Sequence, residues 1–412
     1  METSTLIWHP FTQMQTARTP IPIARGSGIY LYGEDGKRYL DGISSWWVNL
    51  HGHAHPYIVE KIKAQSDKLE HVIFADFTHA PAVELASRLM PLLPGDMAKL
   101  FYSDNGSTAV EVALKIALQY WYNQKINRTK VVCFKNSYHG DTFGAMSAAG
   151  RNSFNQPFWK QLFDVESIDP PIKGQEEKSL QQLQVILDKG EVACFIFEPL
   201  ILGSGGMIIY SGSMLERLIQ CCHAHGVLTI ADEVMTGFGR TGTLFACEQI
   251  QAKPDLICLS KGLTGGFLPL GATACTEKIF NAFLGSHFHQ AFLHGHSYTG
   301  NPLACSSALA SLDLLLEPSC FEQRAMIASS HQAFCEAWHP RFKRCESIGT
   351  ILALEYISEI SIRDRLYDFF LSQGLLLRPL GNVVYVMPPY CIQKEELEWI
   401  YSQIILTLDG DL

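Results

Sequence analysis

Two apolar stretches decide the fold, Val227-Leu-Thr-Ile-Ala-Asp-Glu and Asp255-Leu-Ile-Cys-Leu-Ser-Lys. Each is typical of a buried strand, and each carries a charged side chain to its end, Asp232 in the first and Lys261 in the second. Both stretches run directly into glycine-rich loops, which let a ligand approach the backbone closely. We therefore expect the amine and the carboxylate to reach the same rim of a parallel sheet and to face one crevice.

Either residue alone is more simply explained as a solvated charge or a loop cap. Together they match what pyridoxal phosphate requires, because that cofactor needs a lysine as its Schiff-base partner and an anion that keeps its ring nitrogen protonated. The pair Lys261 and Asp232 therefore predicts an enzyme that uses this cofactor.

Composition narrows the class of protein. The 412 residues are 47% hydrophobic, which is enough to bury two domains, and the net charge of −9 is spread without a basic stripe. Neither nucleic acid nor an anionic membrane surface is expected as a partner, so small molecules are the expected ligands.

The twelve cysteines are scattered and show no Cys-x-x-Cys spacing, and Cys133, Cys194 and Cys258 lie inside apolar strand runs. This pattern favours a reducing compartment. The first residues lack a basic region followed by an apolar stretch, and no apolar segment is long enough to span a bilayer. We expect a soluble cytoplasmic protein.

Short apolar runs alternate with amphipathic helical stretches between residues 51 and 305, as in Lys130-Val-Val-Cys-Phe and Ala193-Cys-Phe-Ile-Phe-Glu. This alternation predicts an α/β domain with a mostly parallel sheet covered by helices. Residues 1–50 contain a hairpin signature around Glu34-Asp-Gly, and residues 306–412 have an α+β pattern. We expect these two ends to build a smaller second domain.

A phosphate-binding site is expected at the start of the helix that follows Tyr102-Ser-Asp-Asn, where Gly106 and Ser107 leave the backbone accessible. Free N–H groups and the helix dipole attract anions there, although an ordinary helix cap is the simpler alternative. Tyr138 follows a predicted strand, where its ring can stack on a planar cofactor, and Asp141 is a weaker candidate behind it. A lone tyrosine is otherwise more often a packing residue.

The segment His294-Gly-His-Ser-Tyr-Thr-Gly also suits an anion, through its glycines and Ser297. His51-Gly-His-Ala-His and the pair His294 and His296 lack matching ligands at characteristic spacing, so no metal site is expected. Arg378 can hold a substrate carboxylate through its forked guanidinium, and a surface ion pair is the alternative.

These residues together resemble the class III, fold-type I aminotransferases that use pyridoxal 5'-phosphate. The general markers are Ala-Asp-Glu-Val-x-Thr-Gly-Phe-Gly-Arg-Thr-Gly and Ser-Lys-Gly-Leu-Thr-Gly-Gly. Narrower markers resemble the adenosylmethionine-8-amino-7-oxononanoate aminotransferases of biotin synthesis, namely Trp8-His-Pro-Phe-Thr-Gln-Met, Ser44-Ser-Trp-Trp-Val-Asn-Leu-His-Gly-His, Tyr138-His-Gly-Asp-Thr-Phe-Gly-Ala-Met-Ser and Arg378-Pro-Leu-Gly.

The resemblance implies a role for each matching position. Lys261, Asp232 and Tyr138 would be catalytic, and the neighbouring subunit of a homodimer would complete the phosphate site. The implied cofactor-binding residues are Gly106, Ser107, Tyr138, Asp232, Lys261, His296 and Ser297. The implied substrate-binding residues are Phe11, Trp46, Tyr138, Lys261, Gly295 and Arg378.

Two positions depart from the family pattern. Phe11 stands where many members that use adenosylmethionine have a tyrosine, and Gly295-His-Ser replaces a common Gly-Pro-Thr. Both variants are similar to members that take lysine as amino donor, whereas Trp46 fits the adenosylmethionine type. The implied reaction converts 8-amino-7-oxononanoate to 7,8-diaminononanoate with S-adenosylmethionine as donor.

Several alternatives remain open. Within the class, they are the same reaction with lysine as donor, another ω-aminotransferase, or a glutamate-semialdehyde mutase. A dinucleotide-binding enzyme is disfavoured because no Gly-x-Gly-x-x-Gly follows a first strand. A non-catalytic cofactor-binding protein is disfavoured by the presence of a competent lysine.

Overall fold

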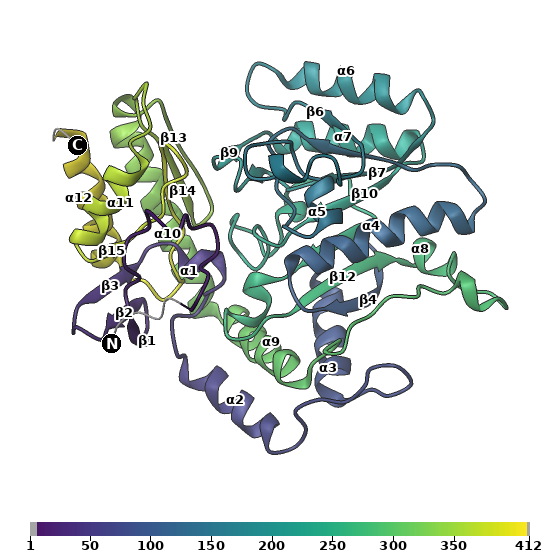
Figure 1. The fold of residues 1–412 in the computed structure, drawn as a ribbon, viewed down its shortest axis with the longest axis horizontal. Helices are drawn as coiled ribbons and strands as arrows, with labels where there is room; N and C mark the ends of the chain where they lie inside the picture. The colour runs from purple at the N-terminus through teal and green to yellow at the C-terminus, as the bar shows by residue number, and fades with distance from the viewer. Residues whose placement is uncertain (1–5, 410–412) are drawn as a thin grey trace.

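A computed structural model describes residues 6–409 of the chain. The observation that the first residues lack a basic region followed by an apolar stretch rests partly on residues 1–5, which lie outside this range. The described residues form a larger part around one sheet and a smaller part that contains segments from residues 23–47 and 318–409 (Figure 1). No helix among the described residues is long and apolar enough to cross a membrane.

The larger part is built on a sheet with seven strands within residues 6–409. The strands are parallel to one another except β12, which is antiparallel to both of its neighbours. Their spatial order is β4 (Met97–Ser103), β12 (Gly271–Thr276), β11 (Leu256–Leu259), β10 (Leu228–Asp232), β7 (Val192–Phe197), β5 (Lys130–Phe134) and β6 (Val165–Ile168). The predicted α/β fold with a mostly parallel sheet is confirmed.

Helices cover both faces of this sheet because successive side chains of each strand point to opposite faces. In β5, Val131 and Cys133 pack in the cluster that contains the buried face of α4 (Gly106–Asn123). Val132 and Phe134 pack in the other cluster, with residues of α6 (Glu176–Leu187) and α7 (Gly212–Ala224). The apolar character on both faces of these strands therefore follows from their position between two helical layers.

Shorter elements complete the larger part. They are α2 (Pro56–Ser66), α3 (Ala80–Leu89), α5 (Phe143–Ser147), α8 (Glu277–Asn281), the small strands β8 (Ile201–Leu202) and β9 (Ile208–Ile209), and the 3-10 turns η1 (Met90–Leu92), η2 (Gln156–Phe158), η3 (Ala246–Gln249), η4 (Lys261–Thr264) and η5 (Phe288–Gln290).

The smaller part joins the two ends of the chain through backbone pairing. Strand β15 (Leu375–Leu376) pairs in parallel with β3 (Arg38–Asp41), which forms the predicted hairpin with β2 (Tyr30–Gly33). The remaining elements are β1 (Ile23–Ser27), the short turn α1 (Ser44–Trp47), β13 (Arg344–Ile348), β14 (Ile351–Glu355), β16 (Val383–Val386), η6 (His339–Arg341), α10 (Pro318–Trp338), α11 (Arg363–Ser372) and α12 (Lys394–Asp409). Helix α9 (Pro302–Leu315) crosses residue 305, and the division of the chain at residues 50 and 305 stays a prediction.

The two parts meet where Gly349, between β13 and β14, approaches the backbone of the loop around Arg240. Gly349 has a φ of +53°, and a Cβ there would lie 2.3 Å from the Gly242 nitrogen and 2.5 Å from the Arg240 carbonyl oxygen. Thr350 N donates to that same Arg240 oxygen at 2.9 Å. Only glycine allows this contact, because the opposing atoms are backbone and have no rotamer to change.

We predict that Gly349→Ala destabilises the protein by about 4 kcal/mol, since it adds a backbone clash to an unfavourable φ. Gly36→Ala is the matched control, because Gly36 has a φ of +82° but open space around its Cβ position. The control should lose only about 1 kcal/mol. Urea unfolding followed by circular dichroism measures both losses, and equal losses would contradict the account of this contact.

Candidate active site

A cleft of about 450 Å³ opens at the rim of the large sheet, where β10 and β11 end. Strand pairing places Asp232 opposite Cys258, three residues before Lys261, so the two strands deliver both charged groups to the same rim. The charged or polar side chains on its wall that carry the chemistry are Ser107, Tyr138, His139, Glu198, Asp232 and Lys261. The expected meeting of the lysine and the aspartate in one crevice is confirmed.

Lys261 begins the turn η4, two residues after β11 ends, and its φ of 44° lies in the left-handed region. Its side chain is only partly exposed, and burial lowers the pKa of its amine to about 8, while the charges of Asp232 and Glu198 act in the opposite direction. The amine nitrogen lies 4.4 Å from the centre of the Trp47 ring. A lysine with a pKa near 8 is partly neutral at physiological pH, which is what a nucleophile or a base requires.

Asp232 is buried at the last position of β10. Its Oδ1 accepts from Val234 N at 3.1 Å, and its Oδ2 lies 2.7 Å from His139 Nδ1. His139 is fully enclosed, and its Nε2 has no hydrogen-bond partner among the described residues. The histidine therefore orients the carboxylate, whose remaining acceptor positions are available to a group in the cleft.

His139 was not among the predicted site residues, although it follows Tyr138 directly. A buried histidine after a strand has no distinctive local pattern, and only its pairing with a residue 93 positions away reveals its role.

The N-terminus of helix α4 is capped by a side chain and also faces the cleft. Asn105 caps the helix, because its side chain accepts from Thr108 N at 3.0 Å and the Thr108 hydroxyl accepts from Asn105 N at 3.1 Å. Gly106 and Ser107 follow the cap and line the cleft, where the first N–H groups of a helix lack partners within the helix. A Cβ on Gly140 would lie 2.2 Å from Ser107 Oγ, so this glycine leaves the space at the helix start open.

Tyr138 and Glu198 form one wall of the cleft. Tyr138 N donates to Glu198 Oε1 at 2.9 Å, and the Tyr138 hydroxyl donates to Asp141 Oδ2 at 2.9 Å. The pKa of Glu198 is raised to about 7, mainly by burial, with the charge of Asp232 acting in the same direction and His139 in the opposite one. Glu198 was missed at the level of sequence, although the quoted run Ala193-Cys-Phe-Ile-Phe-Glu ends on it and β7 lies beside β10.

Three of the predicted substrate residues, Phe11, Trp46 and Arg378, lie together, outside the lining of the cleft that holds Tyr138 and Lys261. The Phe11 ring lies 5.5 Å from the Trp46 ring, and the Arg378 guanidinium lies 4.6 Å from the Trp46 ring. Arg378 has no ion pair within the described part of the chain, so the alternative of an intramolecular surface ion pair is not observed. The tryptophan on the cleft wall is Trp47, which sequence reasoning did not single out.

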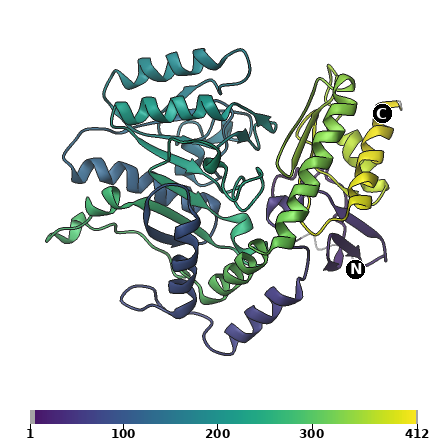
Figure 2. The ribbon, with the colours of Figure 1, turned by 180° about the vertical axis from the view of Figure 1, so that it is seen from behind.

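Gly295, His296 and Ser297 do not line the cleft of their own chain. They lie in a local turn, in which His296 N donates to Thr299 Oγ1 at 3.1 Å and Tyr298 N donates to His296 Nδ1 at 3.2 Å. The segment between α8 and α9 that carries them extends away from the smaller part of the molecule (Figure 2). Among residues 6–409, no group of three or more His, Cys, Asp or Glu side chains could hold a metal ion.

The chain is similar over its whole length to proteins of known family. Residues 11–408 match the family model described as aminotransferase class-III. Adenosylmethionine-8-amino-7-oxononanoate aminotransferase of Synechococcus elongatus is 47% identical and covers 98% of each chain. The enzyme of the same name from Helicobacter pylori is 40% identical and covers 98% of this chain and 96% of its own.

Solved structures agree with this similarity. Adenosylmethionine-8-amino-7-oxononanoate aminotransferase from Methanocaldococcus jannaschii has a TM-score of 0.93 at 36% identity, covering 99% of this chain and 98% of its own. An amine transaminase from an uncultivated Pseudomonas species in its PLP-bound form has a TM-score of 0.92 at 31% identity, covering 98% of both. The protein therefore belongs to the class-III aminotransferase family.

Proposed function

We propose that the protein is a pyridoxal 5'-phosphate-dependent aminotransferase that converts 8-amino-7-oxononanoate to 7,8-diaminononanoate, with S-adenosylmethionine as amino donor. The observation that carries this proposal is the cleft in which Lys261 and Asp232 meet, within a chain similar over its full length to enzymes named for this reaction. The twelve free cysteines support a reducing compartment and hence the cytoplasm.

The donor set of the cleft fits the cofactor. Asp232 would hold the ring nitrogen, Tyr138 would lie against the ring, and the start of α4 at Gly106 and Ser107 would hold the phosphate. Bound pyridoxal phosphate supplies an electrophilic carbonyl and an electron-withdrawing ring. Lys261 would bind that carbonyl through its amine, and the same amine, once released, would move a proton to and from the substrate carbon.

Arg378 would hold the distal carboxylate of 8-amino-7-oxononanoate, because a guanidinium forms two parallel hydrogen bonds to a carboxylate. Trp46, stacked on Arg378 at 4.6 Å, would line the aliphatic part of the substrate. Phe11 contacts Trp46 but offers no hydroxyl to the donor. Lysine is the second candidate donor, because Phe11 and Gly295-His-Ser are similar to the residues of members that take lysine.

We further infer that two copies of the chain form the active unit. The segment with Gly295, His296 and Ser297 does not reach its own cleft, and it presents large exposed side chains at Phe288, Leu293 and Tyr298. Exposed apolar side chains on one segment are typical of an interface. A second copy would bury them and bring Ser297 to the phosphate site of its partner.

Half-reaction spectroscopy tests the proposed function. The cofactor-loaded protein, mixed with S-adenosylmethionine, should lose its visible absorption as pyridoxamine phosphate forms, and it should then aminate 8-amino-7-oxononanoate. Lysine, ornithine and 4-aminobutyrate should react at least about tenfold more slowly, because a site shaped for one amino donor binds the transition state of a differently shaped amine less well. Lys261→Ala is the inactive control and should show no change in absorption with any donor.

Faster conversion by lysine would show that lysine is the donor. Reaction with 4-aminobutyrate alone would contradict the proposed activity.

Subunit complementation tests the dimer. Lys261→Ala and Ser297→Asp should each be inactive, the second because a carboxylate repels the cofactor phosphate. In hybrids, one of the two sites combines an intact Lys261 with an intact Ser297 from the other chain. Refolding equal amounts of the two variants together should therefore restore about a quarter of the wild-type activity, since half of the dimers are hybrids. Activity from Ser297→Asp alone, or none from the mixture, would contradict the shared site.

A further inference from the structure

The turn α1 has a backbone that its sequence does not favour. Ser44, Ser45, Trp46 and Trp47 have φ angles of 52°, 54°, 106° and 72°. None of the four is glycine, and residues with a Cβ rarely adopt this left-handed region in succession. Contacts outside the turn must therefore hold it in place.

This turn places the two tryptophans at different parts of the proposed site. Trp47 lies over the amine of Lys261 at 4.4 Å, and its Nε1 donates to the Tyr385 hydroxyl at 3.1 Å. Trp46 lies against the guanidinium of Arg378 at 4.6 Å. The conformation of α1 therefore couples the position of the amine to that of the expected carboxylate-binding residue.

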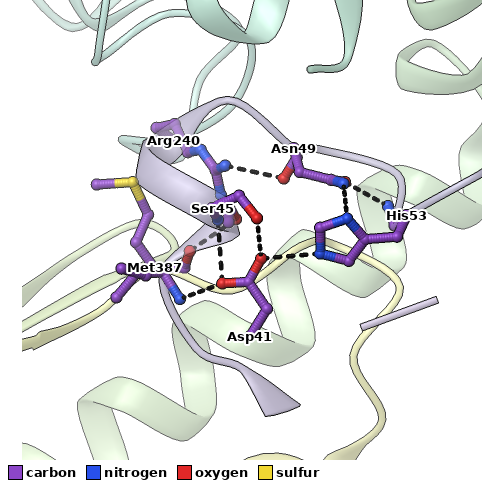
Figure 3. Close-up of polar contacts among 9 residues, drawn as sticks. Asp41, Ser45, Asn49, His53, Arg240 and Met387 are labelled. Carbon is purple, nitrogen blue, oxygen red and sulfur yellow. Dashed lines mark hydrogen bonds and ion pairs between the residues drawn. The ribbon is translucent and has the colours of Figure 1, made fainter. Parts of the chain in front are cut away.

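Asp41, at the end of β3, is the main anchor of the turn (Figure 3). Its fully buried carboxylate accepts four hydrogen bonds. Oδ1 accepts from Ile43 N at 3.2 Å and from Ser45 N at 3.0 Å. Oδ2 accepts from the Ser45 hydroxyl at 2.8 Å and from His53 Nε2 at 2.9 Å. Two of the four donors belong to Ser45 in the middle of the turn.

His53 is fixed in one tautomer by its neighbours. The Asn49 side-chain oxygen accepts from Gly52 N at 2.8 Å, so its amide nitrogen faces His53 Nδ1 at 3.1 Å. Nδ1 therefore accepts, and the ring proton is assigned to Nε2, which donates to Asp41. On the far side of the turn, the buried Arg240 donates to the backbone carbonyl of Asn49 at 3.2 Å. Through the backbone and the side chain of Asn49, Arg240 is thus linked to His53 and on to Asp41 (Figure 3).

We propose that Asp41, oriented by His53, is a positioning residue that fixes Trp47 over the Lys261 amine and Trp46 over Arg378. This inference rests on the proposed function, because it assigns the turn to the amine and carboxylate sites of that reaction. Neither Asp41 nor His53 lines the cleft, so they act through the two tryptophans. The network sets how tightly the cleft encloses the amine.

Asp41→Asn is the direct test, because it keeps the size of the side chain but replaces one acceptor oxygen by an N–H donor. His53 cannot adapt by moving its proton to Nδ1, since that nitrogen faces the amide of Asn49. The turn should loosen, and water should reach the Lys261 amine. The groups that act on that amine are Asp232, Glu198 and Arg240, and the variant alters none of them.

The readout is the pH dependence with which acetic anhydride labels Lys261 in the cofactor-free protein, followed by mass spectrometry. Wild type should show a midpoint of about 8, and Asp41→Asn should shift it toward the ordinary value of 10.5. With the cofactor bound, the KM for 8-amino-7-oxononanoate should rise about fivefold with a smaller change in kcat.

Asp255→Asn is the matched control. Asp255 is a carboxylate with a side chain only 15% exposed, which accepts from Thr229 N and Oγ1 at 2.8 Å each and lies 3.4 Å from His223 Nε2, but it stands at the opposite end of β11. This variant should lower stability and leave the Lys261 midpoint unchanged. Unchanged midpoints in both variants would show that Asp41 is only structural and overturn the proposal.

The histidine gives an independent pair of variants in case Asp41→Asn does not fold. His53→Gln retains an N–H donor toward Asp41 and should keep the wild-type midpoint, whereas His53→Leu should shift it. Equal midpoints in these two variants would contradict the role of the network. Failure of wild type to transaminate would instead refute the proposed function, because the labelling experiment requires neither cofactor nor substrate.

Discussion

Partial burial of the Lys261 amine beside two carboxylates is the interaction on which the site depends. Removal from water lowers its pKa to about 8, and the charges of Asp232 and Glu198 limit that shift. Three neighbouring parallel strands, β7, β10 and β11, supply these groups, because each ends at or just before one of them. The sheet thus converts three distant positions of the chain into one reactive cluster.

The smaller part of the molecule completes this cluster from the other side. Strand β3 leads into α1, whose strained turn brings Trp47 to the amine, and β15 leads to Arg378. Because β3 and β15 pair directly, the tryptophans of α1 and Arg378 both follow strands of one sheet. The backbone pairing of the chain ends therefore contributes to the geometry of the site as well as to stability.

Much of this arrangement could be predicted from sequence, since apolar runs such as the one ending at Asp232 indicate strands buried on both faces. The meeting of Asp232 and Lys261 followed from the common rim of parallel strands. His139 could not be found this way, because its partner lies 93 residues away. The left-handed backbone of the turn at Trp46 and Trp47 could not be predicted either, because the turn contains no glycine. Long-range contacts hold it, such as the hydrogen bond from the Ser44 hydroxyl to the Met387 carbonyl.

Covalent trapping tests the central claim most directly. The protein is loaded with pyridoxal phosphate, reduced with borohydride, digested, and analysed by mass spectrometry for the lysine that carries the pyridoxyl group. In the wild-type protein, the account predicts loss of the visible absorption and a single modified peptide that contains Lys261. The Asp232→Ala variant should fail to retain the cofactor and should therefore carry no label. A label on another lysine, or full labelling without Asp232, would contradict it.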